Sequence, residues 1–192
     1  MIQFPGNEDI QLGSFIAMSE ELGLIEQVDK QVLHKIIDLL SCEEHRNTHI
    51  TANLSLASIN SNSFRSEIFK TLQERPDIAK RIIFSISSYV AHQAGEMFES
   101  FVVLAHRLNS KVKIKRFEAR FIDMEQLKQF NIDYVRLARD YTQDISSDSS
   151  KQSFVEALVA MANIIELPIL AESLNNDADR DTAKSLGLNG FN

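Results

Sequence analysis

The apolar residues of this chain repeat with two periods that alternate along the sequence, and this alternation restricts the fold more than any other feature. Helical spacing is clearest between Leu24 and Leu40, where apolar residues recur every four positions and predict an amphipathic helix. Short apolar runs between the helical segments predict strands. The predicted strands are Ile50–Leu54, Arg81–Ser87, Val112–Phe117, Tyr134–Ala138 and Leu167–Ala171.

Helices are predicted between and after these strands. They carry Phe64 to Leu72, ended by Pro76, then Met97 to Leu108, Asp123–Phe130, Lys151–Glu166 and Asp177–Leu186. Alternating strands and helices with short connections imply parallel strands with helices on the outside. The pattern therefore predicts an α/β fold with at least five parallel strands. A (β/α) barrel and a doubly wound sheet both fit, and periodicity does not choose between them.

The composition bounds the function. The chain has 192 residues, of which 44% are hydrophobic and 24% charged, which is ordinary for a single globular domain. Its net charge of −7 argues against general nucleic-acid binding, because phosphate backbones attract clustered cations. The single cysteine, Cys42, excludes an intrachain disulfide and fits a reducing compartment. We expect a cytoplasmic protein without a signal peptide, or the cytoplasmic part of a membrane-anchored one.

Six short motifs, taken in order, resemble the EAL domain family over nearly the whole chain. Each motif is weak alone, and the six together at these spacings are more specific. The motifs are FIAMSEELGLIEQVDKQVL (Phe15–Leu33), ANLS (Ala52–Ser55), RIIFSISS (Arg81–Ser88), VKIKRFEARF (Val112–Phe121), DYVRLARDY (Asp133–Tyr141) and ILAESLN (Ile169–Asn175). The resemblance implies a TIM-like (β/α) barrel with one reversed strand and a site at the carboxyl ends of the strands.

The resemblance also implies that residues 1–192 form a single EAL domain that lacks two strands of the barrel. The strand that bears the Glu-Ala-Leu motif is expected before Met1, and the last strand is expected after Asn192. The chain is therefore expected to supply most of a barrel without closing it.

Active members of this family hydrolyse cyclic di-GMP with two divalent ions, which need carboxylate and carbonyl ligands. Asn53 and Glu172 match ligands of the family, and other acidic positions are replaced. The replacements are Ser88 for a Glu, Lys115 and Arg116 for paired Asp, Ala138 for the Asp of Lys-Ile-Asp, and Asn175 for a second Glu. Cations at these positions repel Mg²⁺ or Mn²⁺. The resemblance thus implies a degenerate site with no bound metal, no other cofactor, no catalytic residue and no enzymatic activity.

The same substitutions suggest a ligand. Lys115 and Arg116 can pair with a phosphate of cyclic di-GMP in place of the metals, and Arg136, which replaces the Lys of Lys-Ile-Asp, adds a charge. Alternate strand residues point to opposite faces, so only one of Lys115 and Arg116 can face the site squarely. The expected ligand-binding residues are Asn53, Lys115, Arg116, Arg136 and Glu172. The alternative is a decayed site in which these charges are exposed or in which Glu172 pairs with Lys115 or Arg136.

The departures resemble two groups of degenerate EAL proteins. LapD-type receptors bind cyclic di-GMP without cleaving it, and CsrD- and YdiV-type proteins act through protein partners. The first group implies a receptor that signals by changing dimerisation or domain contacts, as in the regulation of biofilms. The second implies a protein-interaction domain that does not bind the nucleotide. Glycines of the family have become Glu118 and Arg120 here, so the loop Glu118–Met124 is the expected partner surface in the second case.

Overall fold

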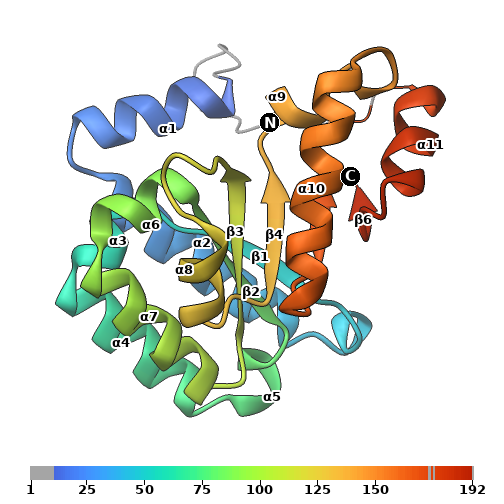
Figure 1. The fold of residues 1–192 in the computed structure, drawn as a ribbon. Helices are drawn as coiled ribbons and strands as arrows, with labels where there is room; N and C mark the ends of the chain where they lie inside the picture. Colours follow the sequence, from blue (N-terminus) through green and yellow to red (C-terminus); the bar gives the residue numbers. More distant parts are fainter. Residues whose placement is uncertain (1–10, 173, 175, 192) are drawn as a thin grey trace.

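The centre of the fold is one sheet of parallel strands, which confirms the α/β fold predicted from the sequence (Figure 1). The computed structural model describes residues 11–172, 174 and 176–191. Within them the strand order follows the sequence, and β1 does not pair with β6, so the barrel-like sheet is open. The strands are β1 (Ile50–Asn53), β2 (Ile82–Ser87), β3 (Lys111–Phe117), β4 (Tyr134–Leu137), β5 (Ile169–Ala171) and β6 (Gly190–Phe191).

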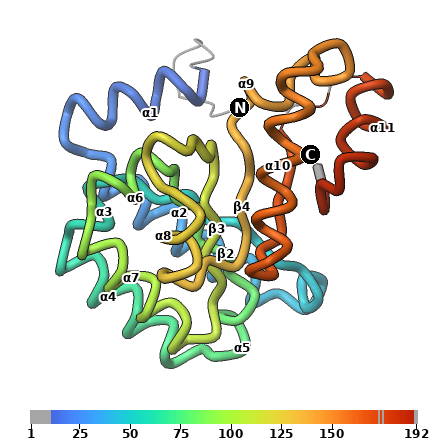
Figure 2. The backbone as a smooth tube through the Cα atoms, viewed as in Figure 1, coloured from blue at the N-terminus to red at the C-terminus, as the bar shows by residue number. Residues whose placement is uncertain are grey.

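Helices surround the sheet on its outer side. Figure 2 shows the segment from α3 to α7 on one side of the central strands and the segment from α9 to α11 on the other. The helices are α1 (Leu12–Glu21), α2 (Ile25–Leu40), η1 (Glu43–His45), α3 (Leu56–Asn60), α4 (Asn62–Gln73), α5 (Pro76–Ala79), α6 (Ser88–Ala94), α7 (Glu96–Arg107), α8 (Met124–Gln129), α9 (Arg139–Thr142), η2 (Ile145–Ser147), α10 (Ser149–Ile164) and α11 (Asp177–Ser185).

Two differences from the sequence prediction concern short elements. The helices α1, α3, α5, α6 and α9 were not predicted, and most of them are too short to display a helical period. The strand after the last helix was expected beyond Asn192. The structure corrects this, because the backbone of Gly190 and Phe191 already pairs with Leu170 and Ala171 of β5. A two-residue strand, Gly190–Phe191, is too short to show an alternation from which a strand can be predicted.

The core lies between the outer face of the sheet and the helices. Phe84 of β2 is fully buried, and its ring meets that of Phe101 on α7 edge-on, with centroids 5.1 Å apart. Phe69 of α4 packs on the same Phe101 ring at 5.5 Å. These aromatic contacts hold the helices α4 and α7 against β2.

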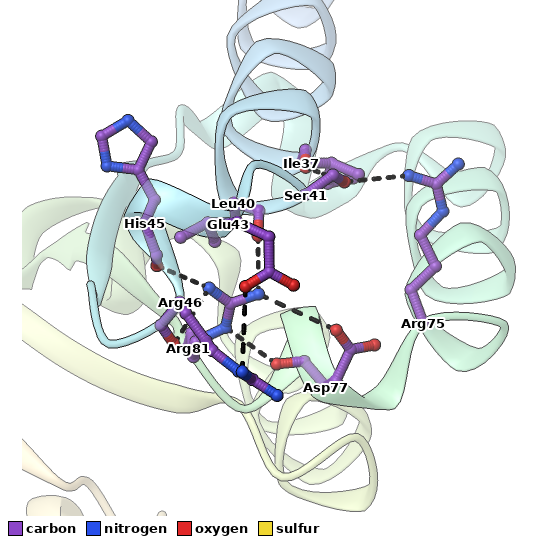
Figure 3. Close-up of polar contacts among 9 residues, drawn as sticks. All are labelled: Ile37, Leu40, Ser41, Glu43, His45, Arg46, Arg75, Asp77 and Arg81. Atoms are coloured by element: carbon purple, nitrogen blue, oxygen red, sulfur yellow. Dashed lines mark hydrogen bonds and ion pairs between the residues drawn. The ribbon is translucent and has the colours of Figure 1, made fainter.

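At the amino end of β2, Arg81 joins three segments of the chain (Figure 3). Its guanidinium donates hydrogen bonds to the carbonyl oxygens of Leu40 at 2.7 Å, His45 at 2.8 Å and Asp77 at 2.9 Å. Leu40 is the last residue of α2, and the last carbonyl groups of a helix have no partner within it. Arg81 therefore caps α2 and ties it to the start of β2.

Asp179 of α11 makes a second buried junction, with η2. Its Oδ1 accepts hydrogen bonds from the backbone N–H of Ser146 at 2.9 Å and from the Ser146 hydroxyl at 2.7 Å. Its Oδ2 accepts from Asn176 Nδ2 at 2.8 Å. Burial opposes ionisation of this carboxyl, but the hydrogen bonds from Ser146 and Asn176 outweigh it and hold the pKa of Asp179 below its ordinary value.

This junction predicts a pH dependence of stability. Because the pKa is depressed in the folded state, the contribution of Asp179 is complete above the unfolded pKa of about 3.9 and is lost as the pH falls through the folded pKa. We expect Asp179→Asn to lower the free energy of unfolding at pH 7 by about 1–3 kcal/mol. The deficit should shrink below about pH 4. Urea unfolding at pH 7, 5 and 3 measures it, with the exposed Asp177→Asn on the same helix as the control. A deficit that stays constant down to pH 3 contradicts the assignment.

Candidate functional site

The residues that the sequence singled out lie at the carboxyl ends of neighbouring strands. Asn53 is the last residue of β1, Lys115 lies near the end of β3, and Ala138 and Glu172 directly follow β4 and β5. The carboxyl ends of parallel strands share one edge of a sheet, where such folds hold their ligands. This is the edge toward which the arrowheads of β3 and β4 point in Figure 1.

The strand register defines which side chains face the interior. In paired parallel strands, partners in register point to the same face, and neighbours along a strand alternate between faces. We call the face opposite the helices the inner face. Its residues are Thr51, Asn53, Ile83, Ser85, Ser87, Lys111, Lys113, Lys115, Tyr134, Arg136 and Leu170.

Lys115 and Asn53 meet on this face. The Lys115 ammonium donates a hydrogen bond to Asn53 Oδ1 at 2.9 Å. Burial lowers the pKa of Lys115, and the positive charges of Arg116 and Arg136 lower it further, while Asp29 acts in the opposite direction. Positive charges therefore gather at a partly buried place, where their attraction for an anion is stronger than in water.

Arg136 and Glu172 form an ion pair near Lys115 in which one polar atom of each side chain has no hydrogen-bond partner among the described residues. Their charged groups lie 3.5 Å apart, and the side chains are 19% and 23% exposed. Arg136 Nε and Glu172 Oε2 are buried, and neither has a hydrogen-bond partner in the described part of the chain. The backbone of Glu172 is fixed to α9, because its carbonyl oxygen accepts a 2.6 Å hydrogen bond from the hydroxyl of the buried Thr142. The expected alternative pairing of Glu172 with Arg136 is therefore present, but it leaves donor and acceptor capacity unused.

Arg116 occupies a different position from Lys115. The register of β3 on β4 shifts between Ile114 and Phe117, and Arg116 sits at this bulge with φ of 49° and an exposed side chain. Its carbonyl oxygen accepts a hydrogen bond from the Ser88 hydroxyl at 2.8 Å. Lys115 lies on the inner face, and Arg116 is exposed at the rim of the site.

The inner face also carries Ser85 and Lys113, which were not among the predicted site residues. Ser88, predicted at the end of β2, directly follows that strand, begins α6 and donates its hydroxyl to the carbonyl oxygen of Arg116. Ser85, three residues earlier, is in register with Asn53 on one side and with Lys113 on the other. The signal for Lys113 was present in the sequence, since the lysines of β3 alternate and must share a face.

Lys113 lies one layer below Lys115 on the same face. Its ammonium donates to Thr51 Oγ1 at 3.4 Å, a long hydrogen bond at an exposed position. Burial lowers the pKa of Lys113, the charge of Arg136 lowers it further, and Glu172 raises it. Lys113, Arg136 and Glu172 therefore act on one another directly through their charges.

The loop beside the site is held by its own contacts. Glu118 and Arg120, the two residues at the family's glycine positions, form an ion pair at 2.6 Å. The Arg120 guanidinium also lies 4.6 Å from the centroid of the Phe121 ring. Phe121 in turn packs edge-on against Tyr89 of α6, with centroids 5.5 Å apart. These contacts anchor the loop to the helix that follows β2.

The donor set does not suit a pair of divalent metal ions. Among the described residues, no group of three or more His, Cys, Asp or Glu side chains comes together. Asn53 already accepts from Lys115, and Glu172 faces Arg136. Asn175, the replacement for a second family Glu, lies outside the described residues.

No helix in the described ranges is long and apolar enough to cross a membrane.

Comparison with known proteins gives the family. The EAL domain family matches residues 2–192. Cyclic di-GMP phosphodiesterase PdeR of Escherichia coli (strain K12) is 23% identical over 177 residues, which cover 91% of this chain and 27% of that protein. RNase E specificity factor CsrD of the same strain is 20% identical over 188 residues, covering 97% and 29%. The chain spans less than a third of the length of either relative.

A solved structure shares the fold. It is that of LapD from Vibrio cholerae, comprising S helix, GGDEF and EAL parts and bound to c-di-GMP. It superposes with a TM-score of 0.86 at 16% identity, over 96% of this chain and 46% of that one. The expected barrel-type fold is confirmed by this similarity, with the sheet open in the residues described here.

Proposed function

Because the chain belongs to the EAL domain family, we propose that it is a member that binds cyclic di-GMP without cleaving it. In this proposal the domain is a receptor that signals by changing its dimerisation or its contacts with other domains. Its relatives include proteins named as phosphodiesterases and CsrD, which is named as a specificity factor. The family therefore leaves the activity of this chain open, and its own side chains must decide it.

The observation that carries the proposal is the replacement of acidic ligands by cations at the site. Lys115 donates to Asn53, and Arg136 faces Glu172, so the remaining oxygen donors are engaged by positive side chains. Ammonium and guanidinium groups pair with phosphate oxygens directly. Lys115 and Arg136 would meet the phosphates, and Asn53 would orient Lys115 toward them. This gives binding without a metal ion.

The same residues do not supply the metal ligands and the general base that hydrolysis requires. Cleavage of a phosphodiester by this family's route needs two metal ions to activate water and to neutralise the phosphate. A lysine and two arginines near the phosphate supply neutralisation alone. A guanidinium stays protonated near neutral pH and cannot act as a general base. Glu172 is the remaining carboxylate candidate for a base, and it is paired with Arg136.

The first test measures cleavage and binding on the same full-length protein. With Mg²⁺ or Mn²⁺, linear product should form no faster than in buffer alone. Calorimetry should give a micromolar or lower Kd for cyclic di-GMP that a metal chelator does not change. The Kd should rise with added salt, because charge pairing at a partly open site is screened. Product formation above the buffer rate that disappears in Glu172→Gln would overturn the proposal.

The alternative is a protein-interaction domain that ignores the nucleotide. It is favoured by the anchored loop Glu118–Met124, where Glu118, Arg120 and Phe121 present charged and aromatic groups beside the site. If the full-length protein shows no calorimetric signal with cyclic di-GMP at high concentration, this alternative replaces the receptor. The partner would then be sought on that loop, and Arg120→Ala should weaken its binding.

A further inference from the structure

Positive charge on the inner face extends below the level of the expected ligand. Lys113, Lys115 and Arg136 on this face and Arg116 at its rim interact through their charges, and we call these four residues the cation cluster. Two carboxylates, Asp29 and Glu172, act on the cluster. Asp29 is committed to hydrogen bonds from the backbone N–H of Ser55 at 2.8 Å and the hydroxyl of Ser58 at 2.7 Å. Four cations against two carboxylates leave an excess of two positive charges.

Unpaired polar atoms at the same place point to a ligand as well. The hydroxyl of Ser85 is 1% exposed and has no hydrogen-bond partner within the described residues. Ser85 is in register with Lys113 on the inner face, and the donor Arg136 Nε is also unpaired. The third unpaired atom, Glu172 Oε2, is an acceptor and does not favour an anion. A buried polar atom without a partner is costly. An anion with several oxygens at the cluster would satisfy the hydroxyl and the guanidinium N–H together.

We propose that the cation cluster selects a phosphomonoester, so that this site takes the linear dinucleotide with a 5′-phosphate in preference to cyclic di-GMP. The inference rests on the proposed function, because it assigns a second ligand to the same site. Hydrolysis of one phosphodiester of the cyclic dinucleotide consumes one water and leaves a 3′-hydroxyl and a 5′-phosphate. Enzymes that open the ring supply this ligand. The linear product would then compete with the cyclic dinucleotide, and the receptor would respond to the ratio of the two.

Charge favours the linear ligand. Each phosphodiester of the cyclic dinucleotide carries one negative charge, whereas a phosphomonoester carries about −1.5 to −2 at pH 7 and has three strong acceptor oxygens. The excess of two positive charges in the cluster matches the second kind of group. The number of hydrogen-bonding groups matches too. The three acceptor oxygens of the phosphomonoester face three donors, Lys113, Arg136 and Ser85, whose donor capacity is weakly used or unused.

Depth favours it for a separate reason. Lys113 precedes Lys115 by two residues, so it lies about 7 Å deeper along β3. A phosphate within a ring is flanked by sugars on both sides and cannot reach that depth end-on. A terminal phosphate is attached on one side only, and it can pass Lys115 and reach Lys113.

The experiment titrates three ligands into the full-length protein by calorimetry. They are cyclic di-GMP, the linear dinucleotide with a 5′-phosphate and the linear dinucleotide without it. The phosphorylated linear form should bind at least about tenfold more tightly than either of the others. Its advantage should fall when the pH drops below about 6, where the phosphomonoester loses its second charge. The affinity for cyclic di-GMP should not change over that range.

Lys113→Met tests the residue that carries the selection, and Lys111→Met is its matched control. Lys111 lies on the same strand and face, and its ammonium donates to the Tyr134 hydroxyl at 2.7 Å, away from the site. Lys113→Met should abolish the advantage of the 5′-phosphate, so that the phosphorylated linear form loses more affinity than cyclic di-GMP does. Lys111→Met should change neither. Thermal unfolding of both variants shows that the fold is retained.

The outcomes separate the inference from the proposed function. If cyclic di-GMP binds and the phosphorylated linear form binds no better, the inference is wrong and the receptor stands. If only the linear form binds, the inference stands and the receptor for the cyclic ligand is wrong. If none of the three binds, both are wrong. An advantage that survives in Lys113→Met overturns the assignment of the phosphomonoester to the cation cluster.

Discussion

Replacing Arg81 with methionine is expected to lower the free energy of unfolding by about 3–5 kcal/mol. Arg81 is 7% exposed, and its guanidinium satisfies the carbonyl groups of Leu40, His45 and Asp77. Methionine preserves the apolar stem of the side chain and leaves the buried Leu40 carbonyl and the partly buried carbonyls of His45 and Asp77 without this donor. Each is a hydrogen bond to a charged group, which is worth more than a neutral one. The ion pair with Asp77, at 3.8 Å to an exposed carboxylate, adds little.

Arg75→Met is the matched control for this variant. Arg75 is exposed, and its guanidinium donates a long hydrogen bond of 3.5 Å to the Ser41 hydroxyl (Figure 3). Its replacement should change stability by less than about 0.5 kcal/mol. Urea unfolding at pH 7 followed by circular dichroism measures both variants. Ligand affinity of the folded Arg81 variant should be unchanged, because Arg81 lies at the amino end of β2. A loss below about 1 kcal/mol would show that the cap is dispensable.

Reversing the charge at Lys115 is expected to weaken cyclic di-GMP binding at least about 30-fold. The Lys115→Glu variant loses the cation that the proposed function places against a phosphate. It also puts a carboxylate beside Asn53, so repulsion of the ligand adds to the lost contact. Part of the loss should be relieved by salt, which screens repulsion, in contrast to the wild-type affinity, which salt weakens.

The control for Lys115→Glu is Lys111→Glu, which makes the same charge change on the same strand and face. The overall charge of the protein is then equal in the two variants, so a difference between them reports position. Lys111 lies at the amino end of β3, bonded to Tyr134, and its reversal should lower affinity less than about threefold. Equal losses in the two variants would mean that the ligand responds to net charge and not to a contact at Lys115.

The strand ends were predictable from the sequence because each apolar run is short and a different pattern follows it. Asn53, Ser88, Ala138 and Glu172 lie at the carboxyl ends of β1, β2, β4 and β5, as predicted. Which residues of a strand face inward was predictable only where polar and apolar residues alternate. In β3 the lysines alternate with Val112 and Ile114, so its inner face is evident from the sequence.

In β2 the serines Ser85 and Ser87 alternate with Phe84 and Ile86. Ile82, Phe84, Ser85 and Ile86 are nevertheless all buried, so both faces of the strand are covered and the inner face is less evident than in β3. The bulge at Arg116 was beyond prediction, because a left-handed φ of 49° at a non-glycine residue depends on tertiary contacts. One of these contacts is the hydrogen bond from Ser88.

The Arg81 cap has a consequence for the order in which the chain assembles. Its bond to the Leu40 carbonyl spans 41 residues, and the entropy of closing so long a loop must be lost before the contact forms. The local helices α2 and α4 can form earlier, because their bonds join residues four apart. The contact between Arg81 and α2 is therefore expected to form after these helices. Conditions that loosen this cap should release the amino-terminal third of the chain as one cooperative piece while η2 and α11 stay joined through Asp179.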